Sequence, residues 1–225
     1  MNPLERVRGG LIVSCQAPPG HPLHGPGYMA AMSRAAVEGG ATGIRAEGRA
    51  DIRAIRRVVG DVPIVGLTKI DRPMDQVFIT PTPDDAEVVV AAGADIVALD
   101  ATPRPRPGGA SVAAIVDCAH QLGALALGDV DSLASAEHAL EVGVDILATT
   151  LAGYTDGPIP DGPDLDLVSR LVALGGTPVV AEGRYSTPEQ VQEAFTRGAC
   201  AVVVGGAITN PLLTTRRFLQ ALPSR

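Results

Sequence analysis

Two residues suited to proton transfer come at the ends of short apolar runs. Lys69 lies at the polar end of the run Val62–Asp71, and Glu182 directly follows the run Pro178–Ala181. An amine becomes a useful base when its pKa falls below the usual ~10.4, and burial beside a cation such as Arg45 would lower it. A carboxylate that faces this amine across a bound molecule would complete a proton-transfer pair.

Both residues have alternative roles. Lys69 could attack a carbonyl group and form a Schiff base, or it could form a structural ion pair with Asp71 or Asp100. Glu182 could form a salt bridge with Arg184, two residues further along the chain. The functional roles are favoured for Lys69, because an amine at the end of a buried strand is in an unusual place.

Glycines near the end of the chain predict a phosphate site. Gly205 and Gly206 follow the apolar run Ala201–Val204 and precede a helix start, so their backbone N–H groups could approach an anion. Gly183 and Arg184 follow the preceding apolar run and could complete the cradle. The alternative is that both glycine pairs only relieve crowding at turns.

Eight apolar runs must position these residues, and each is followed by a helical pattern. Short runs bounded by Gly and Pro are typical of parallel strands buried on both faces. The helical patterns begin with Tyr28–Glu38 and end with a last helix that carries Leu212, Leu213, Phe218 and Leu219. Val77–Thr80 is predicted as a short extra strand. The predicted main strands are Leu11–Cys15, Gly43–Ala46, Val62–Asp71, Asp95–Leu99, Ala124–Leu127, Asp145–Thr149, Pro178–Ala181 and Ala201–Val204.

A weak internal repeat supports this count of eight. Gly40, Gly93, Gly143 and Gly198 each end a helix and lead into a strand, 50 to 55 residues apart, which is two units each time. Eight parallel units close as a (β/α)8 TIM barrel, which we expect to be of the phosphate-binding type and to form one domain over residues 1–225. An open doubly wound sheet is the alternative, but no G-x-G-x-x-G follows the first strand.

The carboxyl ends of the strands form the catalytic face of such a barrel. The predicted site therefore gathers the polar residues that end the strands. These residues are Ser14, Gln16, Arg45, Lys69, Asp100, Asp129, Thr149, Thr150, Glu182, Arg184, Gly205 and Gly206.

The composition excludes several classes of protein. The formal net charge is −7 and the chain has no Trp, so neither nucleic acid nor an anionic membrane is an expected partner. No apolar run approaches the ~20 residues of a membrane span, and the first residues do not read as a signal peptide. Cys15, Cys118 and Cys200 are scattered and predict free thiols in a cytoplasmic protein.

The histidines and paired acids do not predict a metal site. His21 and His24 are separated by Pro22, which denies them a shared helix face. Asp164 is more simply a helix cap, and Asp129 ends a strand where it could touch a substrate. We therefore predict no metal.

Several stretches, taken together, resemble one enzyme family nearly end to end and in the same order. They are GLIVSCQA (Gly10–Ala17), GIRAEG (Gly43–Gly48), the strand ending in Lys69, VFITPT (Val77–Thr82), ALDAT (Ala98–Thr102), TTLAGYT (Thr149–Thr155), AEGRYSTPE (Ala181–Glu189) and VVGGAIT (Val203–Thr209). The family is N-acylmannosamine-6-phosphate 2-epimerase. The resemblance implies a phosphate-binding TIM barrel that interconverts N-acetylmannosamine 6-phosphate and N-acetylglucosamine 6-phosphate in sialic acid breakdown.

The resemblance also implies roles for individual residues. Lys69 would be the acid/base at C2, with Glu182 as its partnering carboxylate. Removal of the C2 hydrogen, which lies α to the open-chain aldehyde, gives an enolate, and return of a proton to the opposite face inverts C2 without a cofactor. The substrate is a small phosphosugar, and we expect a homo-oligomer, a dimer. The residues matched to substrate or phosphate contacts are Gln16, Arg45, Asp129, Gly183, Arg184, Gly205 and Gly206.

The sequence departs from the family pattern close to the predicted site. Ile70 and Arg72 follow the lysine where the family commonly has Arg and Tyr, and Asn210 stands where it tends to have Arg. These departures bear on the preferred sugar. A Lys69 Schiff-base aldolase and a non-catalytic sugar-phosphate-binding barrel remain alternatives. The loop that carries Arg104 and Arg106 either covers the substrate or meets a second subunit.

Overall fold

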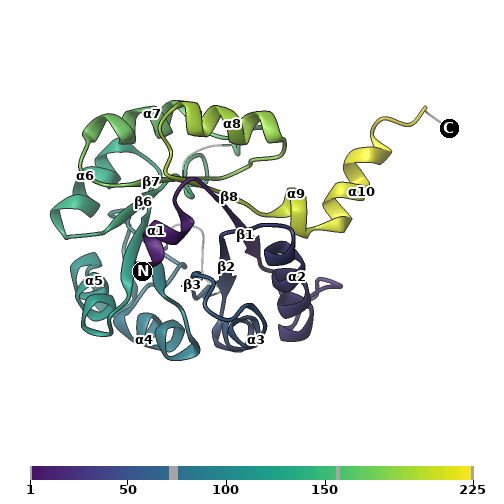
Figure 1. Cartoon of the computed structure of the whole chain (residues 1–225). Helices are drawn as coiled ribbons and strands as arrows, with labels where there is room; N and C mark the ends of the chain where they lie inside the picture. The colour runs from purple at the N-terminus through teal and green to yellow at the C-terminus, as the bar shows by residue number, and fades with distance from the viewer. Residues whose placement is uncertain (1, 71–75, 156–157, 224–225) are drawn as a thin grey trace.

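Eight parallel strands close into a barrel, which confirms the predicted (β/α)8 fold (Figure 1). The computed structural model describes residues 2–70, 76–155 and 158–223. Each strand pairs with the next one in sequence, and β8 pairs with β1 to close the barrel. The strands are β1 Leu11–Cys15, β2 Gly43–Glu47, β3 Ile64–Leu67, β4 Ile96–Asp100, β5 Leu125–Asp129, β6 Ile146–Ala148, β7 Val179–Glu182 and β8 Ala201–Val204.

The strands bury apolar side chains on both faces of the sheet, as their continuous apolar sequences predict. Along β3, Ile64 packs into the layer between the sheet and the helices, while Val65 and Leu67 pack inside the barrel. Short helix α1 (Pro3–Val7) adds Val7 to the interior cluster. This helix was not predicted; Gly9, which follows it, donates to the carbonyl oxygen of Cys200 at 2.7 Å, at the start of β8.

Helices cover the outside of the barrel, and side-chain caps start several of them. Thr82, Ser111, Ser132 and Thr187 each accept a hydrogen bond from the backbone N–H three residues later. The covering helices are α2 Pro26–Glu38, α3 Arg49–Val59, α4 Pro83–Ala92, α5 Val112–Gln121, α6 Leu133–Glu141, α7 Leu165–Leu174 and α8 Pro188–Thr196, with a 3₁₀ turn at Pro107–Gly109.

Strand β3 ends earlier than predicted, so Lys69 lies beyond the barrel ladder. The extra strand predicted at Val77–Thr80 is also wrong: within the described residues it makes a single antiparallel bridge, between Ile79 and Lys69. Thr68 and Thr80 exchange bonds across this turn, with Thr80 N–H donating to the Thr68 carbonyl at 3.0 Å and Thr68 N–H donating to the Thr80 hydroxyl at 3.2 Å. The lysine therefore stands on a short two-stranded turn above the barrel.

The predicted last helix is two helices, α9 (Gly206–Thr209) and α10 (Pro211–Leu219). Figure 1 shows α10 extending away from the barrel toward the C-terminus. None of its residues is buried, and Phe218 has 73% of its surface exposed. Within the described ranges, no helix is long and apolar enough to cross a membrane.

The three cysteines are free, as predicted. Cys15 and Cys200 are buried, while Cys118 is half-buried. Burial raises the pKa of the Cys15 and Cys200 thiols to about 11. These two thiols are therefore protonated and unreactive at neutral pH.

Candidate active site

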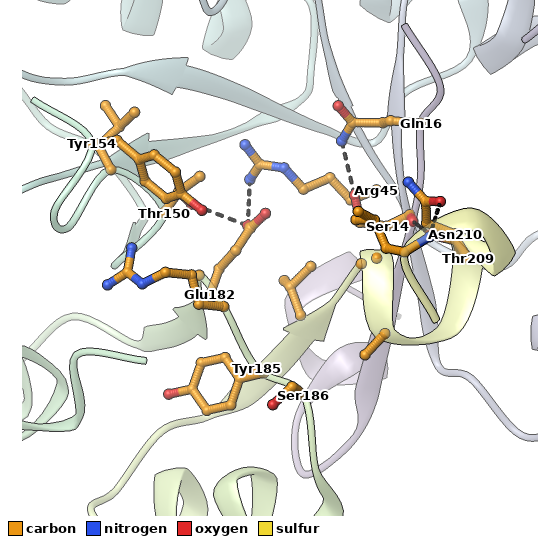
Figure 2. A pocket seen from close by; sticks show the side chains of 18 of the residues that line it. Ser14, Gln16, Arg45, Thr150, Tyr154, Glu182, Tyr185, Ser186, Thr209 and Asn210 are labelled. Atoms are coloured by element: carbon orange, nitrogen blue, oxygen red, sulfur yellow. Dashed lines mark hydrogen bonds and ion pairs between the residues drawn. The ribbon is translucent and has the colours of Figure 1, made fainter. Parts of the chain in front are cut away.

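A cavity of about 680 Å³ opens at the carboxyl ends of the strands (Figure 2). Its wall consists of parts of β1, β2, β7 and β8, the segments that follow β1, β3, β6 and β7, and helices α9 and α10. Asp129 is fully buried beneath this wall, against Arg45. Ten of the predicted site residues line the cavity: Ser14, Gln16, Arg45, Lys69, Thr150, Glu182, Gly183, Arg184, Gly205 and Gly206. Asp100 and Thr149, which were also predicted at this face, are buried and do not line it.

Arg45 holds two carboxylates together at the base of the cavity. Its Nη1 and Nη2 donate to the two oxygens of Asp129 at 3.0 and 2.5 Å, and Nη1 also lies 2.9 Å from Glu182 Oε2. Only 2% of the arginine side chain is exposed. Burial alone would lower the pKa of the guanidinium, but the charges of Asp129 and Glu182 outweigh it and raise the pKa. Arg45 is therefore a permanent buried cation.

Thr150 completes this network from the loop after β6. Its Oγ1 lies 2.6 Å from Asp129 Oδ1 and 3.0 Å from Glu182 Oε2, and its one proton can go to either acceptor. Figure 2 shows Thr150 and Arg45 both directed at the Glu182 carboxylate. Burial raises the pKa of Glu182, the charge of Arg45 opposes this, and Asp129 adds to the increase. Glu182 is thus poised to bind a proton more readily than an exposed glutamate.

Lys69 reaches the cavity from the turn above β3, and two residues hold its amine. Nζ donates to Gln16 Oε1 at 2.7 Å and lies 3.6 Å from Glu47 Oε2. Gln16 is fixed in turn, because its Nε2 donates to Ser14 Oγ at 2.9 Å. The lysine side chain is 39% exposed, so its amine lies at the mouth rather than in the core.

The alternative partners suggested for Lys69 and Glu182 are engaged elsewhere or lie outside the described residues. Asp100 is fully buried and pairs with Arg104 at 2.5 Å and with Arg106 at 3.9 Å. Neither arginine lines the cavity, because their loop turns inward onto Asp100. Asp71 lies outside the described residues, as does Arg72. Glu182 pairs with Arg45 rather than with Arg184.

Arg184 lines the cavity but holds the loop that follows β6. Its Nε donates to the Gly162 carbonyl at 2.6 Å and its Nη1 to the Ala152 carbonyl at 2.5 Å. The guanidinium also lies over the Tyr154 ring, 5.1 Å from its centre. Gly183 precedes it with φ +112°, a left-handed conformation that favours glycine. The sequence placed both residues correctly at the cavity, but it could not predict these loop contacts.

Gly205 and Gly206, together with polar residues of the C-terminal helices, line the part of the cavity that follows β8. Asn210 lies on the wall, and its Oδ1 caps α10 by accepting from the Leu213 N–H at 3.0 Å. Arg217 of α10 also contributes to the wall. Of the departures from the family pattern, Ile70 holds the Lys69 turn, with its N–H donating to the Phe78 carbonyl at 3.0 Å.

Sequence reasoning assigned no role to Glu47, Tyr154 or Arg217, and it placed Thr150 at the catalytic face without assigning its contacts. A signal for Glu47 was available, because it lies two residues after Arg45 on one strand and so points to the same side of the sheet. Arg217 gave no such signal, since its place depends on the direction in which α10 leaves the barrel. Among the residues that the structure describes, no group of three His, Cys, Asp or Glu side chains could hold a metal ion.

A closed (β/α)8 barrel with titratable side chains around a cavity at the carboxyl ends of its strands defines the class of TIM-barrel enzymes. A family model described as NanE, "Putative N-acetylmannosamine-6-phosphate epimerase", matches residues 29–224. The chain belongs to this family of epimerases.

Relatives named "Putative N-acetylmannosamine-6-phosphate 2-epimerase" match over nearly the whole chain. A protein of Klebsiella pneumoniae subsp. pneumoniae is 49% identical over 207 residues, which cover 91% of this chain and 87% of the relative. A protein of Synechococcus elongatus is 45% identical over 226 residues, which cover 99% and 97%.

The solved structure of the N-acetylmannosamine-6-phosphate 2-epimerase from Clostridium perfringens has the same fold. It superposes with a TM-score of 0.93 at 40% identity, covering 97% of this chain and 96% of that one. Thiamine phosphate pyrophosphorylase from Pyrococcus furiosus, with a TM-score of 0.61 at 20% identity over 91% and 89% of the two chains, shares the barrel fold alone.

Proposed function

We propose that this chain inverts C2 of N-acetylmannosamine 6-phosphate to give N-acetylglucosamine 6-phosphate, and the reverse, in sialic acid catabolism. Its family is one of isomerases. One observation carries the assignment of the chemistry to named residues: Lys69 and Glu182 line the same cavity, and Glu182 is fixed there by buried Arg45. An amine and a carboxylate on one cavity are the groups that proton transfer at carbon requires.

In the proposed reaction, the Lys69 amine removes the C2 proton of the open-chain sugar. The electron pair of the broken C–H bond moves into the C1 carbonyl and gives an enolate. A proton then returns to the opposite face of C2, from Glu182 or from the lysine itself, and the aldehyde re-forms. Glu182 suits this role because burial raises its pKa, so that it both holds and releases a proton readily.

The glycine end of the cavity is the proposed phosphate site. Gly183, Gly205 and Gly206 expose backbone without a Cβ atom on the cavity wall, so an anion can approach their N–H groups. Arg184 and Arg217 line the same cavity and supply positive charge there. Fixing the phosphate there would orient C2 toward the amine, which converts binding energy into correct geometry.

The test is exchange of the C2 hydrogen in D₂O. Purified wild type, Lys69→Ala and Glu182→Ala are incubated with N-acetylmannosamine 6-phosphate, and deuterium and epimer are followed by NMR. We expect both in wild type, and a loss of about a hundredfold or more in each variant. A wild-type protein that yields neither deuterium at C2 nor epimer would refute the proposal. Borohydride trapping of substrate on Lys69 would instead favour the aldolase.

We also propose a homodimer in which a second copy of the chain covers α10. Ile208, Leu213, Phe218 and Leu219 on α9 and α10 are exposed, and such a row of apolar side chains is unfavourable in water. A second copy presents the same surface, so the two can pair about a two-fold axis. The single domain over residues 1–225 and the cytoplasmic location also stay predictions.

A further inference from the structure

Lys69 is the only lysine in the chain, because 17 of the 18 Lys and Arg residues are arginine. A guanidinium keeps its proton in proteins, whereas an amine can lose one. The chain therefore has one side-chain amine that could act as a base, and it lies at the mouth of the cavity. How this amine is aimed thus matters for the proposed function, on which the following inference rests.

Among the residues that the structure describes, Glu47 is the carboxylate closest to that amine. It is the last residue of β2, paired in register with Leu67 at the end of β3, and its Oε2 lies 3.6 Å from Lys69 Nζ. It does not line the cavity, so it approaches the amine from behind. Its side chain is 27% exposed, less than that of Lys69. The sheet register thus fixes the carboxylate beside the turn that carries the lysine.

The contacts that Lys69 makes with the described residues leave one direction of its nitrogen for the substrate. A neutral amine has two N–H bonds and one lone pair. Gln16 Oε1 at 2.7 Å accepts one N–H, and the Glu47 carboxylate lies where it can attract the second. With both N–H bonds directed at the protein, the lone pair is left for the cavity. This is the orientation that a base acting on a C–H bond needs.

Of the described carboxylates at the site, only Glu47 forms an ion pair with Lys69. Asp129 and Glu182 share the charge of Arg45 at the base of the cavity. Burial raises the pKa of Glu47, the charge of Lys69 opposes this, Asp51 adds to it and His24 lowers it. The charged groups that face the Glu47–Lys69 pair are therefore Asp51 and His24 on the Glu47 side and Glu182 on the Lys69 side.

We propose that Glu47 is a positioning residue for the Lys69 amine, which it holds together with Gln16 so that the lone pair faces C2 of the substrate. Glu47 itself makes no bond to the sugar. Its removal should therefore lower kcat and leave KM nearly unchanged, because ground-state binding does not depend on it.

Two variants test this proposal by activity. Glu47→Ala removes the contact, Glu47→Gln removes only its charge, and Asp51→Asn is the matched control on a neighbouring acid that faces Glu47 instead of Lys69. We expect kcat for the C2 exchange to fall about tenfold to a hundredfold in Glu47→Ala, with KM and the Asp51→Asn rates within about twofold of wild type. Glu47→Gln decides the question if Glu47→Ala does not fold. Unchanged kcat in Glu47→Gln, or an effect on KM alone, would overturn the proposal.

A second measurement needs no substrate. Because Lys69 is the only lysine, acetylation by acetic anhydride can be followed by mass spectrometry as a function of pH, with the N-terminal amine as internal standard. Glu47→Gln removes the negative charge beside this amine, so Lys69 should be acetylated about twofold faster, relative to the N-terminal amine, than in wild type. An unchanged relative rate would contradict the proposal even in an active enzyme. If acetylation of Lys69 differs between Glu47→Gln and wild type, but the wild type shows no C2 exchange, then this inference stands and the proposed function fails.

Discussion

The side chains at the base of the cavity form one network of charges and hydrogen bonds. Arg45 carries one positive charge and faces two carboxylates, of which Asp129 is fully buried and Glu182 is 13% exposed on the cavity wall. A buried charge that loses its partner costs about 3–5 kcal/mol of stability. Removal of any one of the three would therefore weaken the fold as well as the site, which makes activity alone an ambiguous readout for this network.

The stability of the protein should depend on pH through Glu182. Its pKa is raised in the folded state, so the folded chain holds this proton at pH values where the unfolded chain has released it. Stability from this group is therefore lost as the pH rises from the unfolded pKa through the folded one. Glu182→Gln cannot ionise and should lack this loss. Thermal unfolding of both proteins between about pH 4 and 8 measures the difference; a wild type that gains stability relative to Glu182→Gln over this window would contradict it.

At the scale of residues, the sequence predicted the positions of the site side chains better than their interaction partners. Most predicted site residues line the cavity or, like Asp129, lie directly beneath it, because the end of a strand in a barrel determines where a side chain emerges. Asp100 is the exception, since it pairs with Arg104 and Arg106 away from the cavity. The residues that these side chains contact could not be predicted. Arg184 contacts carbonyls of a loop far away in sequence, and Glu47 meets Lys69 only because β2 and β3 pair in one register. Such choices depend on three-dimensional distances that residue types do not contain.

At the scale of elements, β3 shows how closely the helices pack on the barrel. Gly66 lies in this strand, and a Cβ atom there would come within 2.5 Å of Ala94 Cβ and 3.1 Å of Ile52 Cδ1. A Cβ atom at position 66 would therefore overpack the layer between β3 and its helices.

Alanine substitutions at two glycines should have opposite effects. Gly66→Ala overpacks the layer between β3 and its helices, and it should cost about 1–3 kcal/mol of unfolding free energy. Gly27, in the first turn of α2, has open space around a Cβ atom, so Gly27→Ala should be neutral or stabilise by up to about 1 kcal/mol. Urea unfolding of the two variants checks this. Equal stability of Gly66→Ala and wild type would refute the packing argument.

The order of the elements was predictable, whereas their ends and the shortest elements were not. The eight strands follow from apolar runs that recur with helical patterns between them. The end of β3 at Leu67 depends on Thr68 and Thr80 bonding to each other, and this pairing across a turn leaves no periodic signal. Helix α1 has five residues, too few to show a helical period.

At the scale of the whole molecule, the barrel is closed and covered while α10 is not. The barrel buries its apolar residues in an outer layer and an interior cluster. Helix α10 extends from this body with its apolar side chains exposed, yet Arg217 on the same helix reaches the cavity wall. Covering α10 would therefore also change the surroundings of the cavity.

Loss of the apolar surface on α10 should dissociate the proposed dimer. Phe218→Asp places a charge on its most exposed large apolar side chain, and Val58→Asp does the same at an exposed position on α3 as a control. We expect light scattering after gel filtration to give a dimer for wild type and Val58→Asp, and a monomer for Phe218→Asp. A monomeric wild type, or a Phe218→Asp variant that stays dimeric, would exclude this interface.

The position of Lys69 outside the barrel ladder has a consequence for how this enzyme can diverge. The turn of residues 68–70 and 78–80 is held by few backbone bonds, whereas Arg45, Asp129 and Glu182 are part of the buried barrel. Substitutions in the turn can therefore accumulate at small cost to folding. Natural variation in substrate preference should therefore concentrate around Lys69, while Arg45, Asp129 and Glu182 should stay unchanged.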